Sequence, residues 1–123
     1  MLVRHSHEIE SAPVTMPGAS GVTMRLLVGR EHGAKNFAMR MFEVEPGGHT
    51  PLHQHDYEHE VLVLDGHGQV TGGQTHRPIA PGDVVFIPAN EQHQFRNTAE
   101  QPLRFICLVP TTDNCGCAAV PGS

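Results

Sequence analysis

The residues best suited to chemistry in this sequence are its histidines, which number 10 and outnumber the 8 lysines and arginines together. Three of them, His53, His55 and His59, stand at even separations within one short stretch. Alternate residues of an extended strand share one face, so an extended backbone would point all three imidazoles the same way. Neutral imidazole suits Zn, Cu, Fe and Ni, so the spacing indicates a transition-metal site. A histidine cluster that fills a polar core without metal is the alternative.

A second segment, residues 82–97, supplies a fourth histidine. It contains an apolar strand, a turn with Pro88 and Asn90, and then His93 at the start of another strand. Asn tolerates the positive φ that Gly otherwise provides in turns. The segment therefore predicts two short strands joined by a turn, with His93 at the start of the second.

The two segments together resemble the two sequence motifs of the cupin superfamily. The first motif, with intervals of five, one, three and six residues, matches Gly47, His53, His55, His59 and Gly66. The second matches Gly82, Pro88, Asn90, His93 and Asn97. His59 departs from the commonest pattern, which has Glu there, and Asn90 stands where that pattern has Gly. The gap of 15 residues between the motifs is typical of small single-domain bacterial cupins.

The resemblance implies an all-β fold, the double-stranded β-helix or jelly-roll cupin barrel, with one metal inside. Carried over residue by residue, the ligands are His53, His55, His59 and His93. A site without a carboxylate does not favour Mg or Ca, so the cofactor is expected to be one divalent transition metal: Mn, Fe, Ni, Cu or Zn. Glu60 is the alternative fourth ligand, although regular strand geometry would turn it away from the cluster.

The elements that must position these residues are short strands closed by turns. Gly and Pro together number 23 (13 and 10), too many for a helix bundle. Strands are expected over 23–28, 37–44, 60–64, 69–71, 83–87, 93–97 and 103–109. We expect an N-terminal arm over 1–20, a cupin barrel over 21–109 and a C-terminal tail over 110–123. A core of this size favours a homodimer, with the apolar runs 23–28 and 37–44 as pairing surfaces.

Composition excludes several classes of partner. The net charge is -5 and the basic residues are scattered, so no nucleic-acid surface is expected. No apolar run approaches the roughly 18 residues that cross a membrane, and the N-terminus lacks a signal-peptide stretch, so we expect a cytoplasmic protein. The odd number of cysteines suggests reduced thiols. Cys107 either lines the barrel or packs between the sheets, and packing is favoured. Cys115 and Cys117 are either two thiols of a mobile tail or a soft-metal or redox pair.

Three further residues are candidates for acid–base chemistry. Tyr57 is an even number of residues from His53, His55 and His59, so in an extended backbone it would share their face and could donate a proton at the pocket mouth. The alternative is an ordinary loop residue. Glu58 lies beside His59 in sequence, and His76 lies in the hairpin between the motifs. No dyad among them follows from spacing alone.

Two residues are candidates for substrate binding. Arg40 alternates with Phe42 and Val44, which places it inside the barrel, where a charged group needs a partner. That partner is either a substrate carboxylate or a rim carboxylate such as Glu43 or Asp83. Phe95 follows His93 with the same parity and is expected to form a pocket wall.

These residues favour a metal-dependent enzyme that acts on a small organic acid or enolisable substrate, by oxygenation, isomerisation, cyclisation or hydrolysis. The alternative is a non-catalytic, metal-dependent protein that binds or senses a small molecule, since one fold serves many functions.

Overall fold

The computed structural model describes residues 1–111, so Cys115 and Cys117 lie outside the described part of the chain. Within it the strands are β1 (Ala12–Pro13), β2 (Ser20–Val28), β3 (Phe37–His49), β4 (His59–Asp65), β5 (Gly68–Gly72), β6 (Thr75–Ile79), β7 (Val84–Ile87), β8 (His93–Arg96) and β9 (Leu103–Pro110). Two single 3₁₀ turns, Ser6–Glu8 and Arg30–His32, are the helical segments in this range. Neither is long or apolar enough to cross a membrane.

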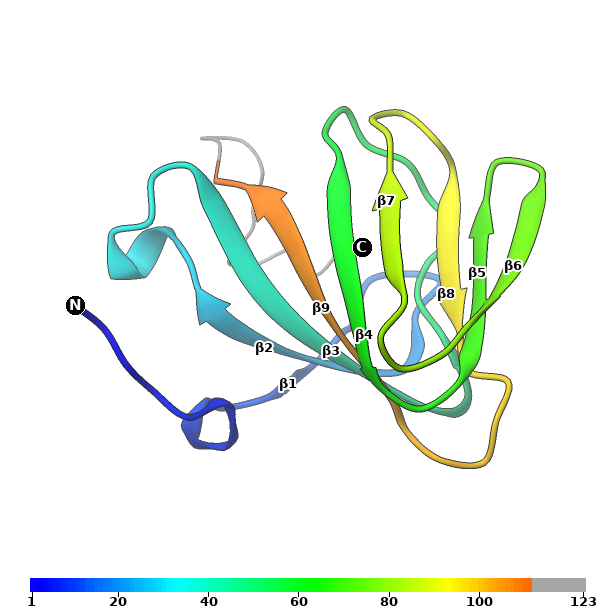
Figure 1. Cartoon of the computed structure of the whole chain (residues 1–123), viewed down its shortest axis with the longest axis horizontal. Helices are drawn as coiled ribbons and strands as arrows, with labels where there is room; N and C mark the ends of the chain where they lie inside the picture. Colours follow the sequence, from blue (N-terminus) through cyan, green and yellow to red (C-terminus); the bar gives the residue numbers. More distant parts are fainter. Residues whose placement is uncertain (112–123) are drawn as a thin grey trace.

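The strands form one curled antiparallel sheet in the order β6-β5-β8-β3-β9-β4-β7, and β2 pairs with the outer edge of β3. Strand β3 belongs to both layers, because its first part pairs with β9 and its last residue, His49, pairs with β8. The sheet therefore folds over on itself, and its two end strands, β6 and β7, are not paired with each other (Figure 1). This is the expected double-stranded β-helix.

The core lies between the two layers and follows the two-residue period of the strands. Along β9 the inward side chains alternate with half-buried ones, and all four inward residues are at most 2% exposed: Leu103, Phe105, Cys107 and Val109. The Phe105 ring stacks on Phe42 at 5.4 Å and on Phe95 at 4.6 Å. This aromatic stack closes the barrel below the histidines and burial of its apolar surface stabilises the fold.

Two local features differ from the expected pattern. Pro46-Gly47-Gly48 does not end a strand but bends β3, with Gly47 at φ 80°. A Cβ at Gly48 would lie 2.5 Å from the carbonyl oxygen of Ser20, so only glycine lets β2 approach here. The hairpin between the motifs also contains a full strand, β6, which the expected strand pattern lacked.

Two asparagines of the second motif, Asn90 and Asn97, have clear structural roles. Asn90 has a φ of 68° and is the single non-glycine residue with positive φ in residues 1–111, as expected for a residue at a glycine position. Asn97 is buried and ties the loop after β8 to the barrel: its Nδ2 donates to the carbonyls of Val44 (2.9 Å) and Gln101 (2.8 Å). Its role is backbone support.

Candidate metal centre

Four histidines from three segments meet at one end of the barrel. His53 and His55 lie in the loop between β3 and β4, His59 begins β4 and His93 begins β8. His53 and His93 form an isolated antiparallel bridge, with N–H···O distances of 3.1 and 2.9 Å. Backbone hydrogen bonds alone thus hold the two sequence motifs side by side.

The imidazole rings face one another across a small space. The ring centroid of His93 lies 4.8 Å from that of His53 and 5.0 Å from those of His55 and His59. One ligand atom each of His53, His55 and His93 lies within 4.8 Å of the other two. Distances of this kind leave room for one ion among the three nitrogens.

Hydrogen bonds orient the three rings toward this space. The Nδ1 atoms of His53 and His93 lie 2.9 Å from the carbonyl oxygens of Pro51 and Glu91, and Nδ1 of His55 lies 3.3 Å from that of Tyr57. A carbonyl only accepts, so each Nδ1 carries the proton and each Nε2 keeps its lone pair. The Nε2 atom of His53 is buried and has no hydrogen-bond partner among the described residues. Imidazoles oriented in this way, with Nδ1 turned to a carbonyl, can offer Nε2 to a transition metal.

His59 is the most deeply placed of the four and is fully buried. Its Nε2 lies 2.7 Å from Nε2 of His55, and its Nδ1 lies 2.9 Å from Sγ of Cys107. The guanidinium Nη2 of Arg40 donates to the same sulfur at 3.4 Å. A chain of contacts therefore leads from the histidines through Cys107 to Arg40.

Burial keeps His55 and His59 neutral. Desolvation, assisted by the neighbouring His93, lowers the pKa of His55 to about 4. Desolvation, assisted by His55 and Arg40, lowers the pKa of His59 to about 2. Desolvation also raises the pKa of the Tyr57 hydroxyl and of the Cys107 thiol, so both stay protonated near neutral pH. Neutral imidazole is the form that binds metal.

The other expected site residues fall into an inner and an outer group. Tyr57 is half-buried and its ring stacks on His55 at 4.1 Å with an interplanar angle of 5°. Arg40 is fully buried inside the barrel, its guanidinium carbon 5.1 Å from the centroid of the Phe42 ring. Phe95 is also fully buried, stacked on Phe105 in the core. These three lie on the inner side, Phe95 below the histidines and Tyr57 beside them.

Glu58, Glu60 and His76 lie on the outside. Both glutamates are exposed and line a surface groove with Phe37. In β4 the burial alternates, so His59 and Val61 point inward while Glu60 points outward. His76 is exposed, with its Nδ1 2.9 Å from Oγ1 of Thr71. The geometry thus brings none of the three to the histidines.

Cys107 was expected in the barrel wall or the core without a contact to the histidines, and Arg77 was not among the expected site residues. Cys107 contacts His59, and the alternation along 103–109 is the feature of the sequence that places it on the inner face. Arg77 lies on the inner face of β6, opposite Val70. The sequence analysis did not predict a strand over 75–79. Such a strand would have placed Arg77 on the same face as Ile79, because residues two apart in a strand share a face.

Comparison with known proteins identifies the family. The cupin domain matches residues 40–109, more than half of the chain. This protein is a cupin. Cupins commonly bind a metal, in keeping with the histidine cluster.

Relatives of this cupin include enzymes and binding proteins. It is 44% identical over 71 residues to the 1-methylthio-D-xylulose 5-phosphate methylsulfurylase of Rhodospirillum rubrum, a match covering 58% of this chain and 46% of the relative, so it spans about half that protein's length. It is 32% identical over 113 residues to the oxalate-binding protein of Thermotoga maritima, covering 89% and 93%. The solved structure of the polyketide cyclase RemF of Streptomyces resistomycificus superimposes with a TM-score of 0.86 at 34% identity, covering 91% and 80%.

Proposed function

We propose that this cupin is a metal-dependent enzyme that acts on a small organic acid or enolisable substrate. The convergence of one ring nitrogen each of His53, His55 and His93, together with the carbonyl that each Nδ1 faces, carries the proposal. His59 is the fourth ligand, and the ion is Mn, Fe, Ni, Cu or Zn, because four nitrogens without a carboxylate do not favour Mg or Ca. When bound, the metal supplies Lewis-acid polarisation of a carbonyl or carboxylate oxygen.

The residues around the histidines have separate roles in this proposal. Tyr57 keeps its proton at Oη near neutral pH, since burial raises its pKa, and it donates a hydrogen bond to bound substrate. Its ring lies flat on His55 and restrains that imidazole. Arg40 places a positive charge beneath the site, which favours an anionic substrate. The similarity to a polyketide cyclase supports chemistry at an enolisable carbon.

A second candidate is a non-catalytic protein that binds or senses a small anion. The similarity along most of both chains to a protein named for oxalate binding favours it. Both candidates use the same metal centre, so metal content does not distinguish them. Catalytic turnover does, because only the enzyme converts its ligand.

The first experiment is elemental analysis of protein purified without an affinity tag or chelator. We expect one transition metal per chain in the wild type and in the matched control His76→Ala, whose side chain is exposed and remote from the cluster. His53→Ala should lose it. No metal in the wild type after reloading with each of the five ions would contradict the proposal.

Turnover is then followed with the metal-loaded protein. Deuterium uptake from D₂O at C3 of 2-oxobutyrate, or oxygen consumption with the same acid, is expected in the wild type and absent in His53→Ala. Saturable binding of oxalate, with no exchange or oxygen uptake for any organic acid tried, would favour the binding protein.

We also propose a homodimer in which a second copy covers the outer face of β4 and β7. This face replaces the expected pairing surfaces 23–28 and 37–44, because most of 37–44 is buried between β2 and β9. Leu62 pairs with Val84 and Glu60 with Phe86 across these strands, and Leu62, Val84 and Phe86 are 42%, 76% and 55% exposed. A protein this small gains stability when such a face is covered. Sedimentation equilibrium should give twice 13.4 kDa for the wild type and the monomer mass for Phe86→Lys. A wild type that sediments as a monomer would contradict it.

A further inference from the structure

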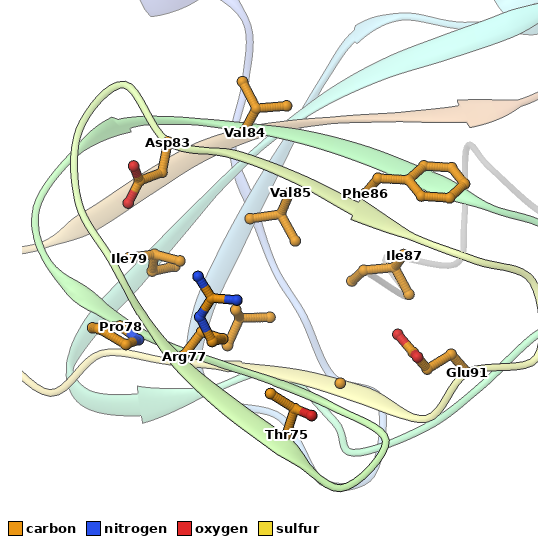
Figure 2. A pocket seen from close by; sticks show the side chains of 12 residues that line it. Thr75, Arg77, Pro78, Ile79, Asp83, Val84, Val85, Phe86, Ile87 and Glu91 are labelled. Atoms are coloured by element: carbon orange, nitrogen blue, oxygen red, sulfur yellow. The ribbon is translucent and has the colours of Figure 1, made fainter.

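A cavity of about 420 Å³ lies at the open side of the barrel, lined by β5, β6, β7 and the loop that leads to β8 (Figure 2). Strands β6 and β7 are the two ends of the sheet order, so the barrel wall is interrupted here. Aliphatic side chains from both sides form the floor: Val70, Ile79, Val85 and Ile87. The cavity has the size of small-molecule sites, with polar side chains around its aliphatic floor.

Arg77 is the one cation among the residues that line this cavity. It pairs across the sheet with Val70, and its neighbour at the same parity, Ile79, pairs with Gly68. Val70 and Ile79 are buried at 8% and 5% exposure, so Arg77 points to the inner side of β6. Figure 2 shows its guanidinium extending into the cavity. This group makes no hydrogen bond or ion pair with any residue in 1–111.

The two carboxylates of the lining do not neutralise Arg77. Asp83 accepts the backbone N–H of Ala80 at 2.8 Å and so serves the turn before β7. Glu91 lies against the turn between β5 and β6, where a Cβ on Gly72 would come within 3.1 Å of its Oε2. Neither forms an ion pair with Arg77 at 4.0 Å or less among the described residues. A guanidinium in this setting is suited to an incoming carboxylate, which it binds through two parallel hydrogen bonds.

The cavity adjoins the histidine cluster through the sheet. Gly72 pairs with His93 and Ile87 pairs with His59, and both Gly72 and Ile87 line the cavity. Thr75, which pairs with Gly72, stands at the level of His93. Arg77 lies two residues further along β6, a step of about 7 Å in a strand. A ligand held at Arg77 would therefore extend along the aliphatic floor toward the histidines.

We propose that this cavity binds the carboxylate of an amphipathic organic acid through Arg77, with the apolar body of the acid on Val70, Ile79, Val85 and Ile87. One carboxylate matches the single guanidinium, whereas a phosphate would bring more charge close to Asp83 and Glu91. The inference deepens the proposed function by naming the substrate class. Only the orientation of the acid toward the histidines rests on that function, because the recognition of the carboxylate requires no metal.

The test is an NMR titration of the protein, stripped of metal with EDTA, against 4-phenylbutyrate and its neutral amide. We expect saturable shifts of the amide signals of Thr75, Val85 and Ile87. Arg77→Gln should weaken carboxylate binding about tenfold to 100-fold, as for lost hydrogen bonds to a charged group. The carboxylate affinity of Arg77→Lys should lie between those of the wild type and Arg77→Gln, since lysine keeps the charge but not the planar guanidinium.

Arg96→Gln is the matched control, because Arg96 is an exposed arginine of β8 that lies outside the cavity. We expect it to bind 4-phenylbutyrate like the wild type. The neutral amide should bind weakly to every variant and show no dependence on Arg77. Equal affinity of wild type and Arg77→Gln for the carboxylate would overturn the proposal, as would the absence of shifts at the cavity residues.

A repeat with zinc-loaded wild type and His53→Ala separates this inference from the proposed function. Carboxylate binding that depends on Arg77 in protein that takes up no zinc would support the cavity and contradict the metal centre. Binding that requires zinc and His53 but is indifferent to Arg77→Gln would support the metal centre and overturn the cavity site.

Discussion

The Nε2 atoms of His55 and His59 lie 2.7 Å apart in the interior of the barrel. Two lone pairs repel at this distance, so either a proton on one nitrogen or a cation must hold them together. Nδ1 of His55 faces a carbonyl and keeps its own proton, which leaves His59 as the donor in the metal-free protein. Nδ1 of His59 then accepts from the Cys107 thiol.

Replacement of His59 tests its place in the centre. In His59→Ala we expect metal affinity to fall by more than the 10- to 100-fold typical of an outer partner, because a ligand itself is lost. Competition for zinc against a chromophoric chelator measures the affinity. His76→Ala is the control and should match the wild type. An unchanged affinity in His59→Ala would leave a centre of three histidines.

Cys107 should control the centre from outside. Cys107→Val keeps the buried volume but removes the contacts with His59 Nδ1 and Arg40, so zinc affinity should fall by about 10- to 100-fold. Cys107→Ser keeps a hydrogen-bonding group at this position, so its zinc affinity should fall less than that of Cys107→Val. The same chelator competition measures both, and equal affinities of Cys107→Val and wild type would show that the sulfur only fills space.

The stability of the metal-free protein should fall as the pH drops below 6.5. The unfolded chain protonates histidine near 6.5, whereas folded His55 and His59 remain neutral down to about 4 and about 2. The unfolded state therefore binds more protons in this window, and the free energy of unfolding falls with falling pH. The buried His59 alone contributes up to about 1.4 kcal/mol per pH unit, and the half-exposed His55 contributes less.

Urea unfolding in EDTA between pH 7.5 and 4.5 measures this dependence. His59→Leu removes the more buried of the two histidines and should flatten the pH profile, while His76→Leu should leave its slope unchanged. A wild-type midpoint that stays constant over the whole range would refute the assignment.

The turn before β8 needs a residue that accepts a left-handed backbone. Asn90 sits at φ 68°, so Asn90→Ala should destabilise the protein by about 1 kcal/mol, while Asn90→Gly should stay close to the wild type. Urea unfolding at pH 7.5 reports both values. If Ala and Gly were equivalent at position 90, the backbone would not be the reason for Asn there.

Much of this protein can be predicted from its sequence. The even spacing of His53, His55 and His59 predicted a histidine cluster, and the recurring short strands between Gly and Pro turns predicted an all-β fold, because strand period and turn chemistry are local properties. The family resemblance added the barrel and the place of His93. The positive φ of Asn90 was predicted in the same way, and the two motifs were sufficient to identify the cupin family.

The tertiary structure decided what depends on pairing between distant segments. The contact of Cys107 with His59 arises because β9 lies beside β4, and the inward direction of Arg77 arises from its pairing with Val70. Two glutamates flank His59 in sequence, Glu58 and Glu60, and His76 lies between the two motifs. All three side chains nevertheless lie on the outer surface. Spacing along the chain sets the face of a residue within its own strand, whereas the register between strands determines which side chains meet.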